Sequence, residues 1–267
     1  MSSPIRLIAL DLDGTLLCDD GSVSARNVQA IQTAVAQNIH VILATGKTRG
    51  SAQGVFAQLG QALPGVFTQG LVIQQADGTV CHETALDRET AVRAITFAVQ
   101  QRLPHLAYCG SRIVAPEDHA YARLLHEKYH EPQPEIIGPF LDQIDELRIN
   151  KFLVSDEAHN DATRARLTGL MGDHATVTQA VPGYIEMLPP GASKGQGVQW
   201  LLDDWGIPAT AVLAVGDGEN DLDMVRLAGV GVAMGNAIPA LKAVADYVTA
   251  DNNHSGVAEA IARFALA

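Results

Sequence analysis

The 267-residue sequence is poor in cysteine and contains no long apolar run. Its three cysteines, Cys18, Cys81 and Cys109, lie far apart and form no Cys-x-x-Cys pair, a pattern typical of reduced thiols in a cytoplasmic protein. No segment approaches the roughly 18–20 apolar residues of a membrane span. The first apolar run ends at Asp11, so a signal peptide is not expected either.

Basic residues are also scarce. The chain has 18 Lys and Arg residues against 30 Asp and Glu residues, which gives a formal net charge of −12. This balance disfavours binding to nucleic acid or to an anionic membrane, because both require clustered positive charge. The hydrophobic share of 47% is that of a globular protein, and the length suits one large domain or two modest ones.

Both ends of the sequence alternate short apolar runs with helical stretches. Buried strands are predicted at residues 5–10, 39–44, 211–215 and 230–233, and helices near 25–37, 49–60, 220–228, 239–245 and 254–267. Ser24 is expected to cap the first helix, with Val28, Ile31 and Val35 along its buried stripe. Alternating strands and helices indicate an α/β core with a Rossmann-like, doubly wound parallel sheet.

The middle of the chain is less regular. It contains a hairpin signal at 66–80, helical stretches at 88–102 and 119–130, and extended runs at 151–154 and 184–188. We therefore predict an α+β domain at 83–187, inserted between core segments 1–82 and 188–267. No internal repeat or low-complexity tract is visible.

Polar side chains gather where the predicted core strands end. Asp11 and Asp13 follow the first strand, Thr45 and Gly46 the second, and residues 216–221 (Gly-Asp-Gly-Glu-Asn-Asp) the third. Asp11 and Asp13 are two residues apart, so in an extended chain they point to the same side. Ligands of parallel sheets bind outside the carboxyl ends of the strands, so the sequence predicts a site there.

The predicted site is acidic. Asp11, Asp13, Asp217 and Asp221 would raise one another's pKa unless a cation neutralises them. Mg²⁺ suits such a site, because it prefers oxygen ligands and is commonly shared with a substrate phosphate. Lys194 can add a second positive charge. Carboxylates, Mg²⁺ and a lysine together favour phosphoryl transfer.

Three other motifs compete with this interpretation. The first is H-E-x-x-H at 126–130, a zinc-protease pattern, but Pro132 soon ends its helix and no third ligand is evident. The second is G-x-S-x-G around Ser193, a hydrolase elbow that His254 could complete, although two prolines stand where the elbow needs a strand. The third, at 46–48, ends like a P-loop but lacks its first glycine. Taken alone, each motif is better explained as a surface helix or a turn.

The order of the core motifs resembles the haloacid dehalogenase (HAD) superfamily of phosphohydrolases, in the Cof-type subgroup with a large C2-type cap. The resemblance covers nearly the whole chain and is specific in the core motifs. It implies that Asp11 is the nucleophile that forms an aspartyl-phosphate. It further implies that Asp13 is the general acid and then the general base, and that Lys194 steadies nucleophile and phosphate.

The resemblance also implies how phosphate and metal are held. Thr45, Gly46 and Asn220 would bind the phosphoryl group. Asp11, the backbone carbonyl of Asp13, Asp217 and Asp221 would hold Mg²⁺. The implied protein is a cytoplasmic, Mg²⁺-dependent phosphatase acting on a small phosphomonoester: a sugar phosphate, a nucleotide or a phosphorylated vitamin. Cap residues His119, Tyr121, Arg123 and Tyr184 are candidates for substrate contact.

Two positions depart from the subgroup pattern. Lys47 stands where Thr-Gly-Arg is usual, with Arg49 nearby, and Gln69 stands where Asn-Gly is usual. A lysine cannot make the two-pronged contact of an arginine, so substrate contacts at Lys47 should differ from those of the subgroup. The change at Gln69 should alter substrate contacts more than the chemical step. A phosphomutase, a serine hydrolase and a non-catalytic sensor of a phosphorylated ligand remain alternatives. The sequence does not indicate an oligomeric state.

Overall fold

The computed structural model describes residues 4–129, 131–179 and 183–266. The chain divides into two compact units, a core unit of Met1–His82 with Ser193–Ala267 and an inserted unit of Glu83–Ala192. The expected return to the core at 187/188 falls inside strand β11 (Tyr184–Leu188), whose last residue pairs with Thr176. The inserted unit therefore extends to Ala192.

The core unit is built on one eight-stranded sheet. The strand order is β14 (Tyr247–Val248), β13 (Val230–Ala233), β12 (Val212–Gly216), β1 (Leu7–Leu10), β2 (His40–Ala44), β3 (Gly65–Phe67), β4 (Val72–Gln74) and β5 (Val80–Glu83). The first six strands in this order pair in parallel, and β4 pairs antiparallel with β3. The predicted α/β fold class is confirmed. Short β3, β4 and β14 were not separately predicted.

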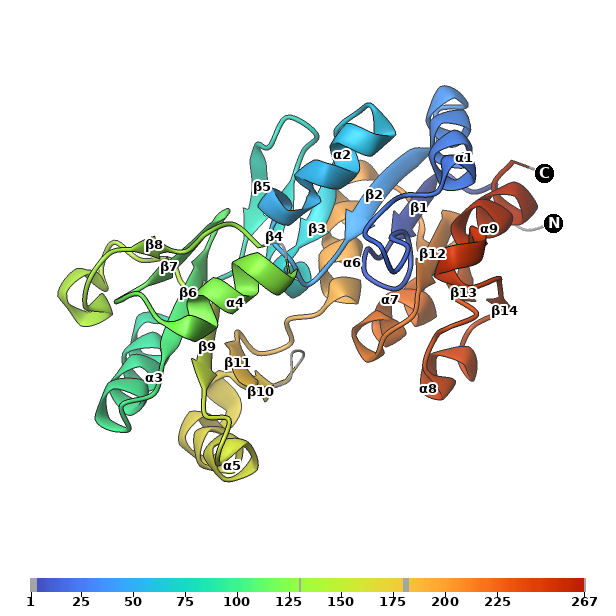
Figure 1. The fold of residues 1–267 in the computed structure, drawn as a ribbon. Helices are drawn as coiled ribbons and strands as arrows, with labels where there is room; N and C mark the ends of the chain where they lie inside the picture. The colour runs from blue at the N-terminus through green and yellow to red at the C-terminus, as the bar shows by residue number, and fades with distance from the viewer. Residues whose placement is uncertain (1–3, 130, 180–182, 267) are drawn as a thin grey trace. The chain divides into compact units, whose positions relative to one another are not determined.

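Two groups of helices accompany this sheet (Figure 1). In one, α1 (Ala25–Ala36) packs against α2 (Gln53–Leu59) and α9 (Gly256–Phe264). In the other, α6 (Lys194–Trp205) packs against α7 (Leu222–Leu227), and α7 against α8 (Pro239–Lys242). From β1 the chain adds β2 and β3 on one side, and later adds β12, β13 and β14 in the opposite direction. Because the crossovers between parallel strands are right-handed, the two groups of helices lie on opposite faces of the sheet.

Ser24 caps α1 as expected, because its side chain accepts a hydrogen bond from the backbone N–H of Asn27. The predicted buried stripe is wrong in part, because Ile31 is buried with Asn27 and Ala34 while the flanking valines are only half-buried. Burial of Asn27 follows from a tertiary contact: its Oδ1 accepts the backbone N–H of Ala258 in α9 at 2.9 Å.

Strand β1 lies where the strand order reverses. Leu10 pairs with Val215 of β12 on one side and with Leu43 of β2 on the other. The backbone N–H of Asp11 continues the pairing by donating to the Val215 carbonyl at 3.1 Å. The chain segments that follow these strands therefore meet at one edge of the sheet, which is the usual ligand site of a doubly wound fold.

The inserted unit has a six-stranded sheet of mostly antiparallel strands, with the order β10 (Thr176–Thr178), β11, β9 (Lys151–Ser155), β6 (His105–Cys109), β7 (Arg112–Ala115) and β8 (Glu135–Ile136). Helices α3 (Arg88–Gln100) and α5 (Asn160–Met171) contribute to one apolar cluster on this sheet, and α4 (Ala120–Tyr129) contributes to another. Helix α5 and strands β6, β7, β8 and β10 were not predicted. Among the described residues, no helix is long and apolar enough to span a membrane.

Candidate active site

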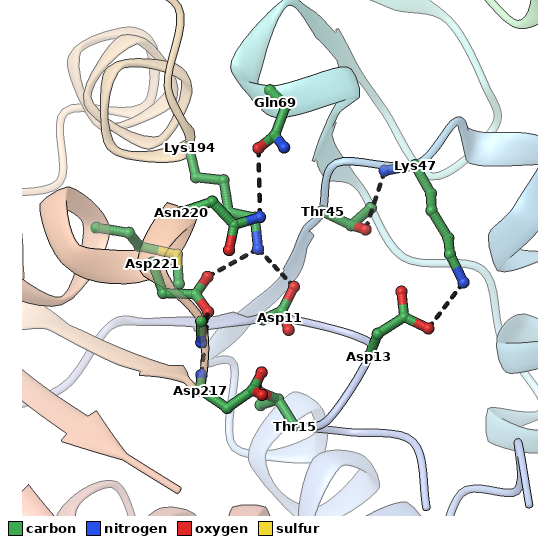
Figure 2. A network of polar contacts seen from close by, with 12 residues as sticks. Asp11, Asp13, Thr15, Thr45, Lys47, Gln69, Lys194, Asp217, Asn220 and Asp221 are labelled. Atoms are coloured by element: carbon green, nitrogen blue, oxygen red, sulfur yellow. Dashed lines mark hydrogen bonds and ion pairs between the residues drawn. The ribbon is translucent and has the colours of Figure 1, made fainter. Parts of the chain in front are cut away.

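Asp11 and Lys194 form the centre of the site. Asp11 is the first residue after β1, and Lys194 is the first residue of α6. The Lys194 Nζ lies 2.5 Å from Asp11 Oδ1 and 2.7 Å from Asp221 Oδ1, so one ammonium joins two carboxylates (Figure 2). Lys194 is 1% exposed, and a buried ion pair of this kind is screened little by solvent.

The segment that follows β12 supplies the two other carboxylates of the site, those of Asp217 and Asp221. Asp221 ends η6 (Glu219–Asp221), just beyond β12, and its Oδ2 accepts the backbone N–H groups of Asp217 and Gly218 at 3.0 Å. Asp217 in turn accepts the Thr15 hydroxyl at 3.0 Å. These bonds fix both side chains before any ligand binds.

Carboxylate oxygens of Asp11, Asp217 and Asp221 all lie within 4.8 Å of one another. Burial raises the pKa of Asp11 well above its ordinary value; the negative charge of Asp221 adds to this and Lys194 opposes it. Burial, followed by the charge of Asp221, also raises the pKa of Asp217. Burial disfavours the charged form of Lys194, but the two carboxylates prevail and raise its pKa. One ammonium therefore leaves the cluster with excess negative charge.

This donor set fits a hard divalent cation. Mg²⁺ and Ca²⁺ prefer oxygen ligands, and Mg²⁺ sites combine one or two carboxylates with water and substrate phosphate. The three carboxylates supply only oxygen, and the one ammonium that contacts two of them does not balance their charge.

Asp13 stands apart from this cluster. Its side chain is 56% exposed, and its Oδ1 accepts a hydrogen bond from the Lys47 Nζ at 2.7 Å (Figure 2). Lys47, the departure noted in the sequence, therefore contacts the predicted acid/base residue. Arg49 is not available for this role, because its guanidinium stacks 4.7 Å from the centre of the Phe56 ring and donates to the Leu63 carbonyl.

The predicted phosphate-binding residues lie beside the acidic cluster. The Thr45 hydroxyl, almost fully buried, accepts the backbone N–H of Lys47 at 3.2 Å. Asn220, at the other side, donates from Nδ2 to Gln69 Oε1 at 3.4 Å. The Gln69 amide packs against Gly46, where a Cβ would lie 2.8 Å from Nε2. The structure thus brings these three loops together.

Gly14 is required for both its conformation and its size. Its φ is +75°, in the left-handed region that residues with a Cβ rarely adopt. A Cβ at this position would also lie 2.4 Å from Asp217 Oδ2. The turn after Asp13 can therefore pass against Asp217 only with glycine.

The competing motifs have other local roles. Ser193 caps α6 by accepting the Gln196 N–H, and His254 bonds to Asp251. In the H-E-x-x-H motif, His126 Nδ1 bonds to the Glu131 carbonyl, and His130 lies outside the described residues. No hydrolase elbow or complete zinc-ligand set is built from the residues that the structure describes.

The candidate substrate residues of the inserted unit have local partners. His119 accepts the Ala122 N–H at the start of α4, and Arg123 pairs with Asp118. Tyr184 is 2% exposed and donates its hydroxyl to the Tyr121 carbonyl. These contacts fix the side chains within their own unit and do not identify a substrate.

Sequence reasoning missed the roles of Thr15, Lys47 and Gln69 in the site. Thr15 closes the loop after β1 onto Asp217, and its place in the Asp-x-Asp-Gly-Thr motif was the available signal. The contacts of Lys47 and Gln69 depend on loop geometry that spacing does not reveal.

The sequence profile of the haloacid dehalogenase-like hydrolases matches residues 8–261. The chain belongs to this family. A solved haloacid dehalogenase-like hydrolase from Bacteroides thetaiotaomicron superposes with a TM-score of 0.88 at 30% identity, covering 97% of this chain and 99% of that one.

Two further relatives are similar over nearly the whole of this chain. The Bacillus subtilis protein YitU, a 5-amino-6-(5-phospho-D-ribitylamino)uracil phosphatase, is 29% identical over 260 residues, 94% of each chain. The chloroplastic endoribonuclease YBEY of Arabidopsis thaliana is 36% identical over 97% of this chain, but this chain spans only 46% of that protein's length. The family and its phosphatase members make this chain a HAD-type phosphatase.

Proposed function

We propose that this hydrolase cleaves small phosphorylated metabolites in a Mg²⁺-dependent reaction through an aspartyl-phosphate on Asp11. The observation that carries the proposal is the arrangement of Lys194, which joins Asp11 to Asp221 with Asp217 alongside. A binding protein could neutralise a phosphate with basic residues alone. A buried carboxylate held by a lysine suits a nucleophile that must approach a phosphate of like charge.

In the proposed first step, an oxygen of Asp11 attacks phosphorus and the bond from phosphorus to the leaving-group oxygen breaks. Asp13 gives its proton to that oxygen. In the second step, Asp13 takes a proton from water, the water oxygen attacks phosphorus, and the Asp11 carboxylate departs as inorganic phosphate forms. Asp13 suits both transfers because its carboxyl group is half exposed and can reach substrate or water.

Asp11, Asp217, Asp221 and the carbonyl of Asp13 would hold Mg²⁺, which would supply positive charge to the phosphoryl oxygens. Thr45, Gly46 and Asn220 would bind and orient the same group, and Lys194 would keep Asp11 aligned. Side chains already fixed by hydrogen bonds need little rearrangement in the transition state.

The substrate is proposed as a class: a sugar phosphate, a nucleotide or a phosphorylated vitamin. The substrate named for YitU is likewise a small molecule that carries a phosphate, there on a ribityl group. The three cysteines are unpaired, which supports a reducing compartment such as the cytoplasm.

Hydrolysis of p-nitrophenyl phosphate tests the reaction. Activity should disappear with EDTA and return with added Mg²⁺, and Asp11→Asn should abolish turnover while the protein stays folded. Activity that survives chelation, or near-normal turnover by Asp11→Asn, would contradict the proposal. Inorganic phosphate should form in proportion to p-nitrophenol; a product without free phosphate would indicate transfer to another acceptor, as in a mutase. A panel of phosphorylated metabolites then ranks substrates by kcat/KM.

A further inference from the structure

The short turn η2 (Thr68–Gly70), between β3 and β4, has an unusual backbone. Thr68, Gln69 and Gly70 have φ values of 51°, 58° and 91°, so three successive residues are left-handed. This conformation is unfavourable for residues with a Cβ, and most of all for a β-branched residue such as Thr68. Thr68 Oγ1 is also buried with no hydrogen-bond partner in the described structure. Strain of this kind persists only where surrounding contacts enforce it, and it is concentrated at functional sites.

Backbone contacts hold the turn against two segments of the site. The N–H of Thr68 donates to the Lys47 carbonyl at 2.9 Å, and the N–H of Gln69 to the Thr45 carbonyl at 3.2 Å. Gly70 packs directly on the start of α6, where a Cβ on it would lie 2.0 Å from the Ser193 carbonyl oxygen. The turn therefore connects the Thr45–Lys47 loop with the helix that begins at Lys194.

The side chain of Gln69 extends this connection to a third segment. Gln69 is 8% exposed, its Nε2 lies against Gly46, and its Oε1 accepts a hydrogen bond from Asn220 Nδ2 (Figure 2). Because Oε1 can only accept, the contact turns the amino group of Asn220, rather than its carbonyl oxygen, toward Gln69. An amide nitrogen has two N–H groups, so one remains for another acceptor.

We propose that Gln69 is a positioning residue that presents the Asn220 amide to the phosphoryl group as a donor. The proposal rests on the phosphatase function proposed above. Without Gln69, the exposed Asn220 side chain could rotate and offer its carbonyl oxygen, which repels a phosphate. At 3.4 Å the contact is at the long end of the hydrogen-bond range, and such contacts commonly tighten when substrate binds.

A double-mutant cycle between Gln69 and Asn220 tests this role. The variants are Gln69→Leu, which keeps the size and removes the hydrogen bond, Asn220→Ala, and the double variant, assayed with p-nitrophenyl phosphate and Mg²⁺. We expect Gln69→Leu to lower kcat by about tenfold in the Asn220 background and by less than about twofold in the Asn220→Ala background. A merely structural role would lower kcat equally in both backgrounds, and that result would overturn the proposal.

Two further variants keep the test decisive. Gln69→Asn has a side chain that tolerates left-handed backbone but is one methylene shorter, so it should remain folded and still lose the coupling to Asn220. Retained coupling in this variant would overturn the proposal. Gln74→Leu, a buried glutamine in β4, is the matched control and should leave kcat unchanged. An inactive wild-type protein, or an active Asp11→Asn variant, would instead refute the phosphatase function itself.

Discussion

Replacing Lys194 by methionine tests how the acidic cluster is held together. Methionine keeps the length of the side chain and removes the charge that lies 2.5 Å from Asp11 and 2.7 Å from Asp221. Removal of one partner from a buried ion pair costs about 3–5 kcal/mol, because the remaining charge stays buried without compensation. The substitution removes two ion pairs, but proton uptake by Asp11 offsets part of the cost of losing the pair between Lys194 and Asp11. The free energy of unfolding should therefore fall by about 3–5 kcal/mol, the cost of one such pair.

For a chain of this size, that loss corresponds to a decrease in Tm of about 10 °C in the absence of metal. Mg²⁺ should recover part of it, because the Lys194→Met cluster lacks the ammonium that repels a second cation, and Mg²⁺ can displace the proton that Asp11 takes up. The increase in Tm on adding Mg²⁺ should therefore be larger for the variant than for the wild type. Activity should not recover, since removing one stabilising group aimed at the reacting phosphate lowers kcat by about 10² or more.

The measurements are thermal unfolding with EDTA and with a Mg²⁺ titration, and kcat for p-nitrophenyl phosphate. Lys128→Met, an exposed lysine on α4, is the matched control and should change the free energy of unfolding by less than about 0.5 kcal/mol. A Tm for Lys194→Met within about 2 °C of the wild type without metal would refute the idea that this lysine compensates buried carboxylates. If Mg²⁺ raises Tm equally in both proteins, the result would refute the idea that Lys194 and the metal ion compensate the same carboxylates.

Three other predictions follow from the same geometry. Asp13→Asn should still form the aspartyl-phosphate from p-nitrophenyl phosphate, because the leaving group of this substrate needs no proton, but the variant should hydrolyse that aspartyl-phosphate slowly. Mass spectrometry should then find protein that carries one phosphate. If turnover is slow and no such adduct is found, the result would count against the role of Asp13 as a base. Lys47→Met should lower kcat by about tenfold by loosening Asp13, with recovery in Lys47→Arg, and an unchanged kcat would show that the ion pair is incidental. Because burial raises the pKa of Asp11 and of Asp217, the contribution of these two groups to the stability of the metal-free protein is greatest below their ordinary pKa of 3.8 and is lost as pH rises through the raised values. The gain in Tm from Mg²⁺ should accordingly grow with pH over this range, and a pH-independent gain would contradict the direction of these shifts.

Much of the core could be predicted from the sequence, since its strands are buried on both faces and read as continuous apolar runs. Strand β13 was predicted at its observed residues, and the polar segments that follow β1, β2 and β12 were placed together by the rule for parallel sheets. In the inserted unit, strand β11 was likewise predicted at its observed residues.

What the sequence could not predict depends on side-chain contacts that apolar periodicity does not encode. Helix α5 was missed because its buried positions are Thr163, Leu167 and Met171, and the first of these is polar. Thr163 is accommodated because its hydroxyl donates to Asp156. In the site, the contact of Lys47 with Asp13 joins residues 34 positions apart through loop conformation, which apolar periodicity does not encode.

The central place of β1 in its sheet has a consequence for synthesis on the ribosome. One edge of β1 pairs with β2, which is made soon afterwards, but the other edge pairs with β12, which begins at Val212. The inserted unit is one continuous stretch whose strands pair among themselves, so it can complete its own sheet while the N-terminal strand still has an open edge. Lys194, Asp217 and Asp221 emerge later still. A nascent chain therefore carries its nucleophile before the inserted unit is made, and gains the surroundings that make it reactive only after β12 has emerged.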